Sequence, residues 1–196
     1  MPARNHSGWI SYWLGRLWMA LFGWKVAGQP PNSKKYILIA EPHTSNWDLP
    51  FMLFAAYIYG IKLSWMAKHT LFRKPFGFLL RYLGGIPVNR TSARGVVAQM
   101  VDRFRQSEQL IVAISPSGTR GRVNYWKSGF YRMACEARIP ITCGFLDYAN
   151  KIAGFGCSFM PTGNPARDMQ KIRDFYRDKT GKNTANMSPI RLQQEE

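Results

Sequence analysis

Short apolar runs alternate with longer segments of helical periodicity through most of this 196-residue chain. The runs that predict buried strands are 36–40, 61–67, 85–88, 110–114, 141–146 and 152–160, the last two close enough to form a hairpin. Helices are predicted at 49–59, 70–83, 92–106, 127–137 and 168–179, the second of them broken by Pro75 and Gly77. This alternation predicts an α/β fold, a single domain with a mixed, largely parallel sheet flanked by helices. We place the domain at 34–180, after a linker at 29–33, and expect a loosely ordered tail at 181–196.

The N-terminal segment 8–24 has a different character. Its apolar residues recur on one helical face, namely Ile10, Trp13, Leu14, Leu17, Trp18 and Leu21. The segment is too short for a comfortable membrane span, carries Arg16 in its middle and lacks the cleavage site of a signal peptide. We therefore predict that residues 1–27 form an amphipathic, membrane-associating helix that lies in the interface. The alternative is a helix buried on the domain, and both hold if one face contacts protein and the other lipid.

The chain is strongly basic, with 27 Lys and Arg residues against 11 Asp and Glu residues and a formal net charge of +16. Such a surface favours polyanionic partners such as nucleic acid, anionic lipid or phosphorylated substrates. Nucleic acid is not expected, because the aromatic residues do not interleave with basic residues in a recognisable binding motif. A non-catalytic basic protein that binds anionic membrane or nucleic acid stays open as an alternative.

Several kinds of site are disfavoured by the sequence. The cysteines Cys135, Cys143 and Cys157 form no C-x-x-C pair, and the histidines are not spaced with them as zinc ligands would be. We expect no metal and interpret the cysteines as reduced core residues. The sequence also lacks G-x-S-x-G, G-x4-G-K-[ST] and a G-x-G-x-x-G after a strand, which disfavours the usual hydrolase, P-loop and dinucleotide sites.

A candidate general base follows the first predicted strand. His43 precedes Asp48 by five positions, and no further acidic residue occurs between Asp48 and Asp102. An imidazole can remove a proton from a hydroxyl near neutral pH, and a carboxylate can fix its tautomer and stabilise the imidazolium. The alternative is a surface histidine beside an aspartate that caps a helix.

Two turns after predicted strands are candidate phosphate sites. Gly118, Thr119 and Arg120 follow the strand 110–114, and Arg90 follows the strand 85–88. Glycine lets backbone N–H groups approach an anion, threonine adds a hydroxyl, and arginine offers a bidentate fork. Lys127 is a further candidate cation. The alternatives are surface arginines and an ordinary helix start.

Taken in order, these segments resemble the glycerolipid acyltransferase family typified by bacterial 1-acylglycerol-3-phosphate acyltransferase. The first family motif, H-x4-D, matches His43 and Asp48, and the second, a glycine–isoleucine block ending in arginine, is similar to 85–90. The third motif, usually Phe-Pro-Glu-Gly-Thr-Arg, corresponds to 115–120, and the fourth, a proline-containing apolar strand, to 138–141. The resemblance covers roughly residues 36–160.

The resemblance implies a glycerol-3-phosphate acyltransferase-like fold and direct acyl transfer, from acyl-CoA or acyl-carrier protein to the free hydroxyl of lysophosphatidic acid. It implies that His43 is the base, oriented by Asp48, and that Gly118, Thr119, Arg120 and Arg90 hold the acceptor phosphate. No cofactor and no metal are implied beyond the thioester co-substrate. The expected partners are anionic membrane lipids, and the expected location is peripheral or monotopic on the cytoplasmic face of a membrane.

One position departs from the family pattern. Ser117 stands where the third motif normally carries glutamate, which removes a charge and most of the reach of the side chain. A different lysolipid or lipid-linked hydroxyl is therefore kept open as the acceptor. Lys68, Ser117 and Lys127 are further candidate substrate contacts.

Overall fold

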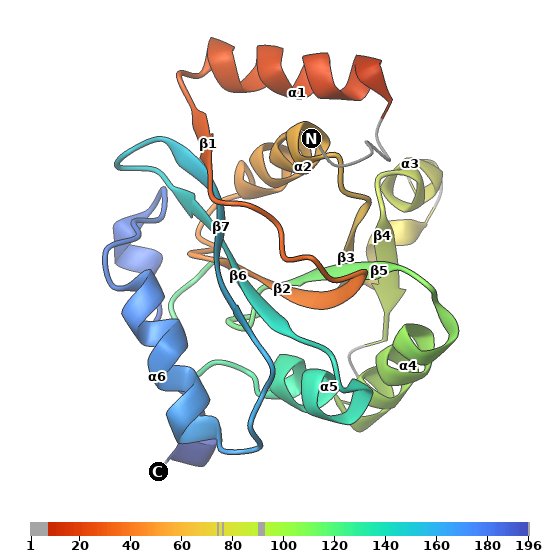
Figure 1. Ribbon diagram of the computed structural model, residues 1–196, viewed down its shortest axis with the longest axis vertical. Coiled ribbons are helices and arrows are strands. Elements are labelled where there is room, and N and C mark those ends of the chain that lie inside the picture. Colours follow the sequence, from red (N-terminus) through yellow and green to blue (C-terminus); the bar gives the residue numbers. More distant parts are fainter. Residues whose placement is uncertain (1–7, 74, 76, 90–92, 196) are drawn as a thin grey trace.

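The structure is a computed structural model and describes residues 8–73, 75, 77–89 and 93–195 (Figure 1). Its α-helices are α1 (Trp9–Leu21), α2 (Asp48–Tyr59), α3 (Gly77–Tyr82), α4 (Ala93–Gln106), α5 (Gly129–Ala137) and α6 (Pro165–Tyr176). Its strands are β1 (Lys25–Ala27), β2 (Lys35–Glu41), β3 (Leu63–Lys68), β4 (Gly85–Val88), β5 (Leu110–Ile114), β6 (Ile141–Asp147) and β7 (Ile152–Phe159). Three short 3-10 helices complete it, η1 (His69–Phe72), η2 (Thr184–Asn186) and η3 (Gln193–Glu195).

The strands form one seven-stranded sheet in the order β1-β7-β6-β2-β5-β3-β4. Within it β6 and β7 run antiparallel, as a hairpin, and the other neighbouring strands are parallel. This confirms the predicted α/β domain with a mixed, largely parallel sheet. The strand β1 corrects the predicted bounds, because residues 25–27 were assigned to the N-terminal helix and instead join the sheet of the domain. Its three residues pair with β7 from the other end of the chain, which no local pattern signals.

Helices cover both faces of the sheet (Figure 1), and the side chains of β2 show how they are divided. Ile37 and Ile39 belong to the buried cluster that includes residues of α4, α5 and α6. Tyr36 and Leu38 belong to a second cluster that includes residues of α2. Since successive side chains of a strand point to opposite faces, the unbroken apolar run 36–40 suits a strand buried on both sides.

The helix α1 packs against α2 through a narrow strip of its surface. A Cβ atom on Gly15 would lie 2.6 Å from the carbonyl oxygen of Phe54, so this close approach requires glycine. Trp18 stacks on Phe54 with ring centroids 4.5 Å apart, and Met19 is buried. These contacts fix one side of the helix on the protein.

Most of the apolar face predicted for this helix points away from α2. Several of its large apolar residues are each 49–75% exposed, namely Trp9, Ile10, Trp13, Leu14, Leu17 and Leu21. Of the predicted face, Trp18 packs on α2. No helix in the described part of the chain is long and apolar enough to cross a membrane.

The C-terminal segment differs from the expected loosely ordered tail, because residues 181–195 pack on the domain. Leu192 is 1% exposed, and the backbone N–H of Trp126 donates to the carbonyl of Arg191 at 2.8 Å. Asn183 donates from its side chain to the carbonyl of Thr44 at 2.8 Å and from its backbone to the Thr44 hydroxyl at 3.1 Å. The segment therefore supports the loop that follows β2.

Candidate active site

The residues singled out from the sequence gather at one edge of the sheet. His43 follows β2, Lys68 ends β3, and the loop 115–120 follows β5. These three strands are parallel, with β5 between β2 and β3, so their carboxyl ends open at the same edge. Open α/β sheets bind ligands outside these carboxyl ends, which makes this edge the candidate active site. The predicted contact Arg90 lies outside the described residues.

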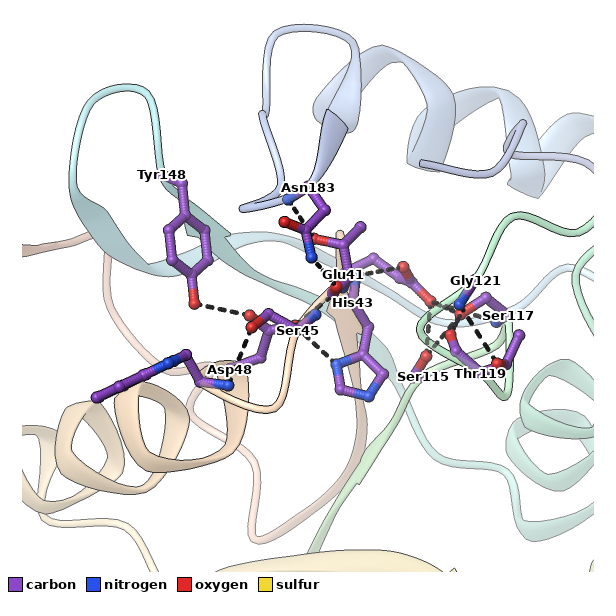
Figure 2. Close-up of polar contacts among 12 residues, drawn as sticks. Glu41, His43, Ser45, Asp48, Ser115, Ser117, Thr119, Gly121, Tyr148 and Asn183 are labelled. Atoms are coloured by element: carbon purple, nitrogen blue, oxygen red, sulfur yellow. Dashed lines mark hydrogen bonds and ion pairs between the residues drawn. The ribbon is translucent and has the colours of Figure 1, made fainter. Parts of the chain in front are cut away.

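His43 and Asp48 form a hydrogen-bonded pair (Figure 2), with Nδ1 of His43 and Oδ2 of Asp48 2.9 Å apart. Asp48 is the first residue of α2 and is 5% exposed, whereas the His43 side chain is 27% exposed. A carboxylate at Nδ1 keeps the proton on that nitrogen and leaves Nε2 as the basic nitrogen. The ring is thus arranged to accept a proton from a hydroxyl group.

Asp48 is held by three further hydrogen bonds. Its Oδ2 accepts the backbone N–H groups of Thr44 and Ser45 at 2.9 and 3.0 Å, and its Oδ1 accepts the hydroxyl of Tyr148 at 2.7 Å. Burial raises the pKa of Tyr148, and the neighbouring Asp48 carboxylate raises it further, so the phenol keeps its proton and donates. These contacts fix the carboxylate at the positive end of α2, where a negative charge is favoured.

Glu41, the last residue of β2, is a second buried carboxylate at this edge, 6% exposed. Its Oε2 accepts the backbone N–H of His43 at 2.8 Å. Its Oε1 accepts the hydroxyl of Ser115 at 2.8 Å and the hydroxyl of Ser117 at the same distance (Figure 2). Burial raises the pKa of Glu41 above its usual value, and the hydrogen bonds from His43, Ser115 and Ser117 offset only part of that rise.

Two cavities meet at His43. The first, of about 680 Å³, extends between the sheet and α2, and the second, of about 610 Å³, lies against α4 and α5. The apolar residues of the first include Leu38, Met52, Ala56, Tyr59 and Phe155. The apolar residues of the second include Val96, Val97, Phe130 and Met133. Both volumes are typical of small-molecule sites, and apolar walls on two sides of a base suit substrates with hydrocarbon chains.

Most of the predicted substrate contacts line these cavities. Lys68, Thr119 and Arg120 line the first, Lys127 lines the second, and Gly118 lines both. Gly118 adopts a φ of 70°, which favours glycine, and a Cβ atom there would lie 3.0 Å from Nζ of Lys127. The glycine thus brings a turn of backbone next to a lysine ammonium group.

Ser117 is placed differently from the other candidates. It is 4% exposed and is not among the residues that line either cavity. Its backbone N–H donates to Oε1 of Glu41 at 3.2 Å, and its hydroxyl lies 2.8 Å from the same atom. The structure therefore directs Ser117 toward Glu41 instead of toward the space for a substrate.

Sequence reasoning missed Glu41, Tyr148 and Asn183. Glu41 ends an apolar strand, a position where a carboxylate is usually solvated, and nothing local marks it as buried. Tyr148 lies 100 residues from Asp48, in the turn between β6 and β7, and Asn183 lies 139 residues from Thr44. No spacing in the sequence signals such contacts.

The cysteines are free thiols, with Cys143 buried and Cys135 and Cys157 half-buried. Within residues 8–73, 75, 77–89 and 93–195, no group of three or more His, Cys, Asp and Glu side chains is arranged to hold a metal ion.

Comparisons with known proteins agree with this architecture. The model of the acyltransferase family matches residues 25–143, a span that contains His43, Asp48 and the loop 115–120. The chain therefore belongs to the acyltransferase family. It is 31% identical over 148 residues to the 1-acyl-sn-glycerol-3-phosphate acyltransferase of Escherichia coli (strain K12). The aligned region covers 70% of this chain and 58% of that protein. This chain thus matches less than two thirds of the length of that relative.

The fold is similar to the crystal structure of PlsC, the 1-acyl-sn-glycerophosphate (LPA) acyltransferase from Thermotoga maritima. The TM-score is 0.56 at 14% sequence identity, with 86% of this chain and 74% of that chain covered. The likeness confirms the expected fold.

Proposed function

We propose that this protein is a membrane-associated O-acyltransferase that moves a fatty acyl group from acyl-CoA or acyl-carrier protein to the free hydroxyl of lysophosphatidic acid. The proposal rests above all on the position of His43, which is bound to Asp48 at Nδ1 and lies where two largely apolar cavities meet. Such a reaction brings together two hydrocarbon chains, one on the thioester and one on the acceptor. Membership of the acyltransferase family supports the reaction class, and similarity to the E. coli 1-acyl-sn-glycerol-3-phosphate acyltransferase supports the acceptor.

In the proposed mechanism, Nε2 of His43 removes the proton of the acceptor hydroxyl as its oxygen attacks the thioester carbonyl carbon. The new C–O bond forms, the carbonyl oxygen becomes an oxyanion, and collapse of this intermediate breaks the C–S bond. The thiolate then takes the proton from the imidazolium, which Asp48 stabilises. General-base help of this kind typically contributes about 10²- to 10⁴-fold. The scheme uses no covalent acyl-enzyme, metal or cofactor.

The acceptor phosphate is assigned to the basic side of the first cavity. Arg120, Thr119 and Gly118 lie on the loop after β5, and Lys68 ends the neighbouring strand β3. A guanidinium, a hydroxyl and glycine backbone N–H groups are donors that suit a phosphate. Arg90 is kept as a further contact in this proposal.

Association with a membrane is supported by exposed apolar residues around α1. The outward face of α1 carries exposed large apolar residues such as Trp9 and Leu17, and on α3 the side chains of Phe78 and Tyr82 are 73% and 85% exposed. Figure 1 shows α1 and α3 on the side of the sheet that α2 covers. Such residues favour the interface, and the formal charge of +16 favours anionic lipid. We propose a peripheral or monotopic location on the cytoplasmic face.

A different lysolipid or lipid-linked hydroxyl is the second candidate acceptor. The observation that favours it is Ser117, because the family motif has a charged residue at this position and this chain has a neutral one turned toward Glu41. A panel of lysolipid acceptors distinguishes the two candidates.

The test is acyl transfer in mixed micelles with labelled acyl-CoA or acyl-carrier protein. Wild type is compared with His43→Ala and with His69→Ala, a matched control at an exposed histidine that lines neither cavity. Product from wild type and His69→Ala, with little from His43→Ala, supports the proposal. Equal product from all three contradicts the role of His43. Absence of product with every donor and acceptor contradicts the transferase and favours a non-catalytic protein that binds anionic surfaces.

A further inference from the structure

Glu41 contacts two loops of the candidate active site at once. Its Oε2 accepts the backbone N–H of His43, and its Oε1 accepts the backbone N–H of Ser117 together with the hydroxyls of Ser115 and Ser117. The two serines lie 74 and 76 residues away along the chain. A single carboxylate therefore joins the ends of β2 and β5 (Figure 2).

The surroundings of Glu41 suit a carboxylate better than other side chains. It is buried, and each hydrogen bond described for it comes from a backbone N–H or a hydroxyl. A carboxylate accepts at both oxygens and matches all of these donors, which favour its ionised form while burial opposes it. An amide would place its NH2 group against an N–H of one loop, and an apolar side chain would leave both backbone N–H groups without this acceptor.

We infer that Glu41 is a positioning residue for acyl transfer, which holds the backbone of His43 and the loop 115–120 in one arrangement so that base and phosphate contacts face the same substrate. This inference rests on the proposed function. It also gives Ser117 a role, because its hydroxyl oxygen lies 2.8 Å from Oε1 of Glu41. This chain lacks the glutamate that the third motif normally carries at position 117. Glu41 supplies a carboxylate there from β2, and the small side chain of Ser117 leaves room for it.

Moving the carboxylate from position 41 to position 117 tests the inference. Kinetics of acyl transfer and urea unfolding are measured for wild type, Glu41→Ala, Ser117→Glu and the double variant Glu41→Ala/Ser117→Glu. Glu41→Ala is expected to lower kcat/KM for lysophosphatidic acid by about 10- to 100-fold, the span for hydrogen bonds to a charged group. Ser117→Glu places two carboxylates in contact and is expected to lower it as well. The double variant restores one carboxylate between the loops and is expected to regain about tenfold over Glu41→Ala.

Asp168→Asn is the matched control. Asp168 is another buried carboxylate, which accepts hydrogen bonds from Tyr131 and Thr162 instead of from the active-site loops. This control is expected to lose stability while kcat and KM of the folded protein stay at the wild-type values. If Glu41→Ala behaves in the same way, the positioning role is refuted.

The double variant decides the remaining cases. If Glu41→Ala does not fold, a double variant that folds and transfers acyl groups supports the inference, and one that regains stability without activity refutes it. If wild type itself transfers no acyl group, the proposed function fails, and the bridge between the loops is judged from unfolding alone. Compensation between the two substitutions then supports the bridge, and simple additivity of their effects on stability refutes it.

Discussion

Replacing Asp48 by asparagine removes the negative charge beside His43 and keeps the hydrogen bond between the two side chains. Oδ2 faces three donors, the N–H groups of Thr44 and Ser45 and Nδ1 of His43, whereas Oδ1 faces the hydroxyl of Tyr148. The asparagine satisfies these groups only if its oxygen takes the place of Oδ2. Its NH2 group then donates to the tyrosine hydroxyl, which can turn and accept. Asp48→Asn therefore keeps the tautomer of the histidine and removes only the negative charge.

The lost charge matters most when His43 is protonated during the reaction. Two unit charges about 4 Å apart attract each other by about 4 kcal/mol at an effective dielectric constant of about 20. A dielectric constant of about 20 is appropriate because Asp48 is buried and the His43 side chain is only 27% exposed. A loss of about 4 kcal/mol from the transition state lowers kcat by about 10³-fold.

The assay measures kcat, KM and urea unfolding for wild type, Asp48→Asn and Asp48→Ala. Asp48→Asn is expected to lower kcat with little change in KM, and to keep the free energy of unfolding within about 1 kcal/mol of wild type. Asp48→Ala leaves the buried donors without an acceptor and is expected to lose stability as well as activity. If Asp48→Asn keeps kcat within about tenfold of wild type, the carboxylate does not stabilise a charged His43 and the electrostatic reasoning is wrong.

Three further variants test buried or half-buried side chains of the domain, one of them in contact with Asp48. Leu192→Ala removes a fully buried side chain and is expected to lower the free energy of unfolding by about 2–5 kcal/mol in urea, whereas a loose tail would leave it unchanged. Although burial alone would raise the pKa of Asp168, hydrogen bonds led by the Thr162 N–H hold it below its usual value. A carboxylate with a lowered pKa in the folded protein stabilises it at pH values above its unfolded pKa of about 3.9, and this stabilisation is lost as the pH falls through the folded pKa. The urea midpoints of wild type and Asp168→Asn should therefore differ at pH 7 and converge in acid. Tyr148→Phe removes one hydrogen bond to Asp48 and is expected to lower kcat by about 3- to 10-fold with the fold intact, which circular dichroism and kinetics together would check.

The sequence predicts what depends on local periodicity and spacing. The apolar run 36–40 predicts a buried strand, and the structure has it in the interior of β2. The pairing of His43 with Asp48 is predictable because the two residues lie close in sequence, in the loop after β2 and at the start of α2. The order of the strands is a different kind of information. In the sheet β5 lies beside β2 although β3 and β4 come earlier in the chain, and this order brings Ser117 to Glu41.

The tail shows a related limit. Residues 181–196 are mostly polar, which is typical of a disordered end, yet one apolar side chain, Leu192, fills a buried site and Asn183 bonds to the loop of the base. Composition averages over a segment, whereas order can depend on one or two well-placed side chains. This explains why the prediction for the tail differs from the structure.

The helix α1 shows that periodicity gives the apolar face of a helix but not what that face contacts. Its apolar residues were expected to lie on lipid or on the domain, and in the structure Gly15 and Met19 contact the domain while Leu17 is 57% exposed. Deleting the helix would uncover the aromatic residues of α2 and confuse lipid binding with loss of packing. A point substitution on the outward face avoids this problem.

Leu17→Glu is therefore the sharper test of membrane association, with Ala20→Glu as the matched control. Both positions are exposed on α1 and both variants add one negative charge, but only the first removes a large apolar side chain. Burying a leucine contributes about 1.5–3 kcal/mol, so Leu17→Glu is expected to weaken sedimentation with anionic vesicles at least about tenfold more than Ala20→Glu. Both should unfold at the wild-type urea concentration. Since the charge of the surface acts through screened attraction, residual binding of Leu17→Glu should fall as salt is raised. Equal binding of the two variants would mean that the outward face of α1 does not contact the bilayer.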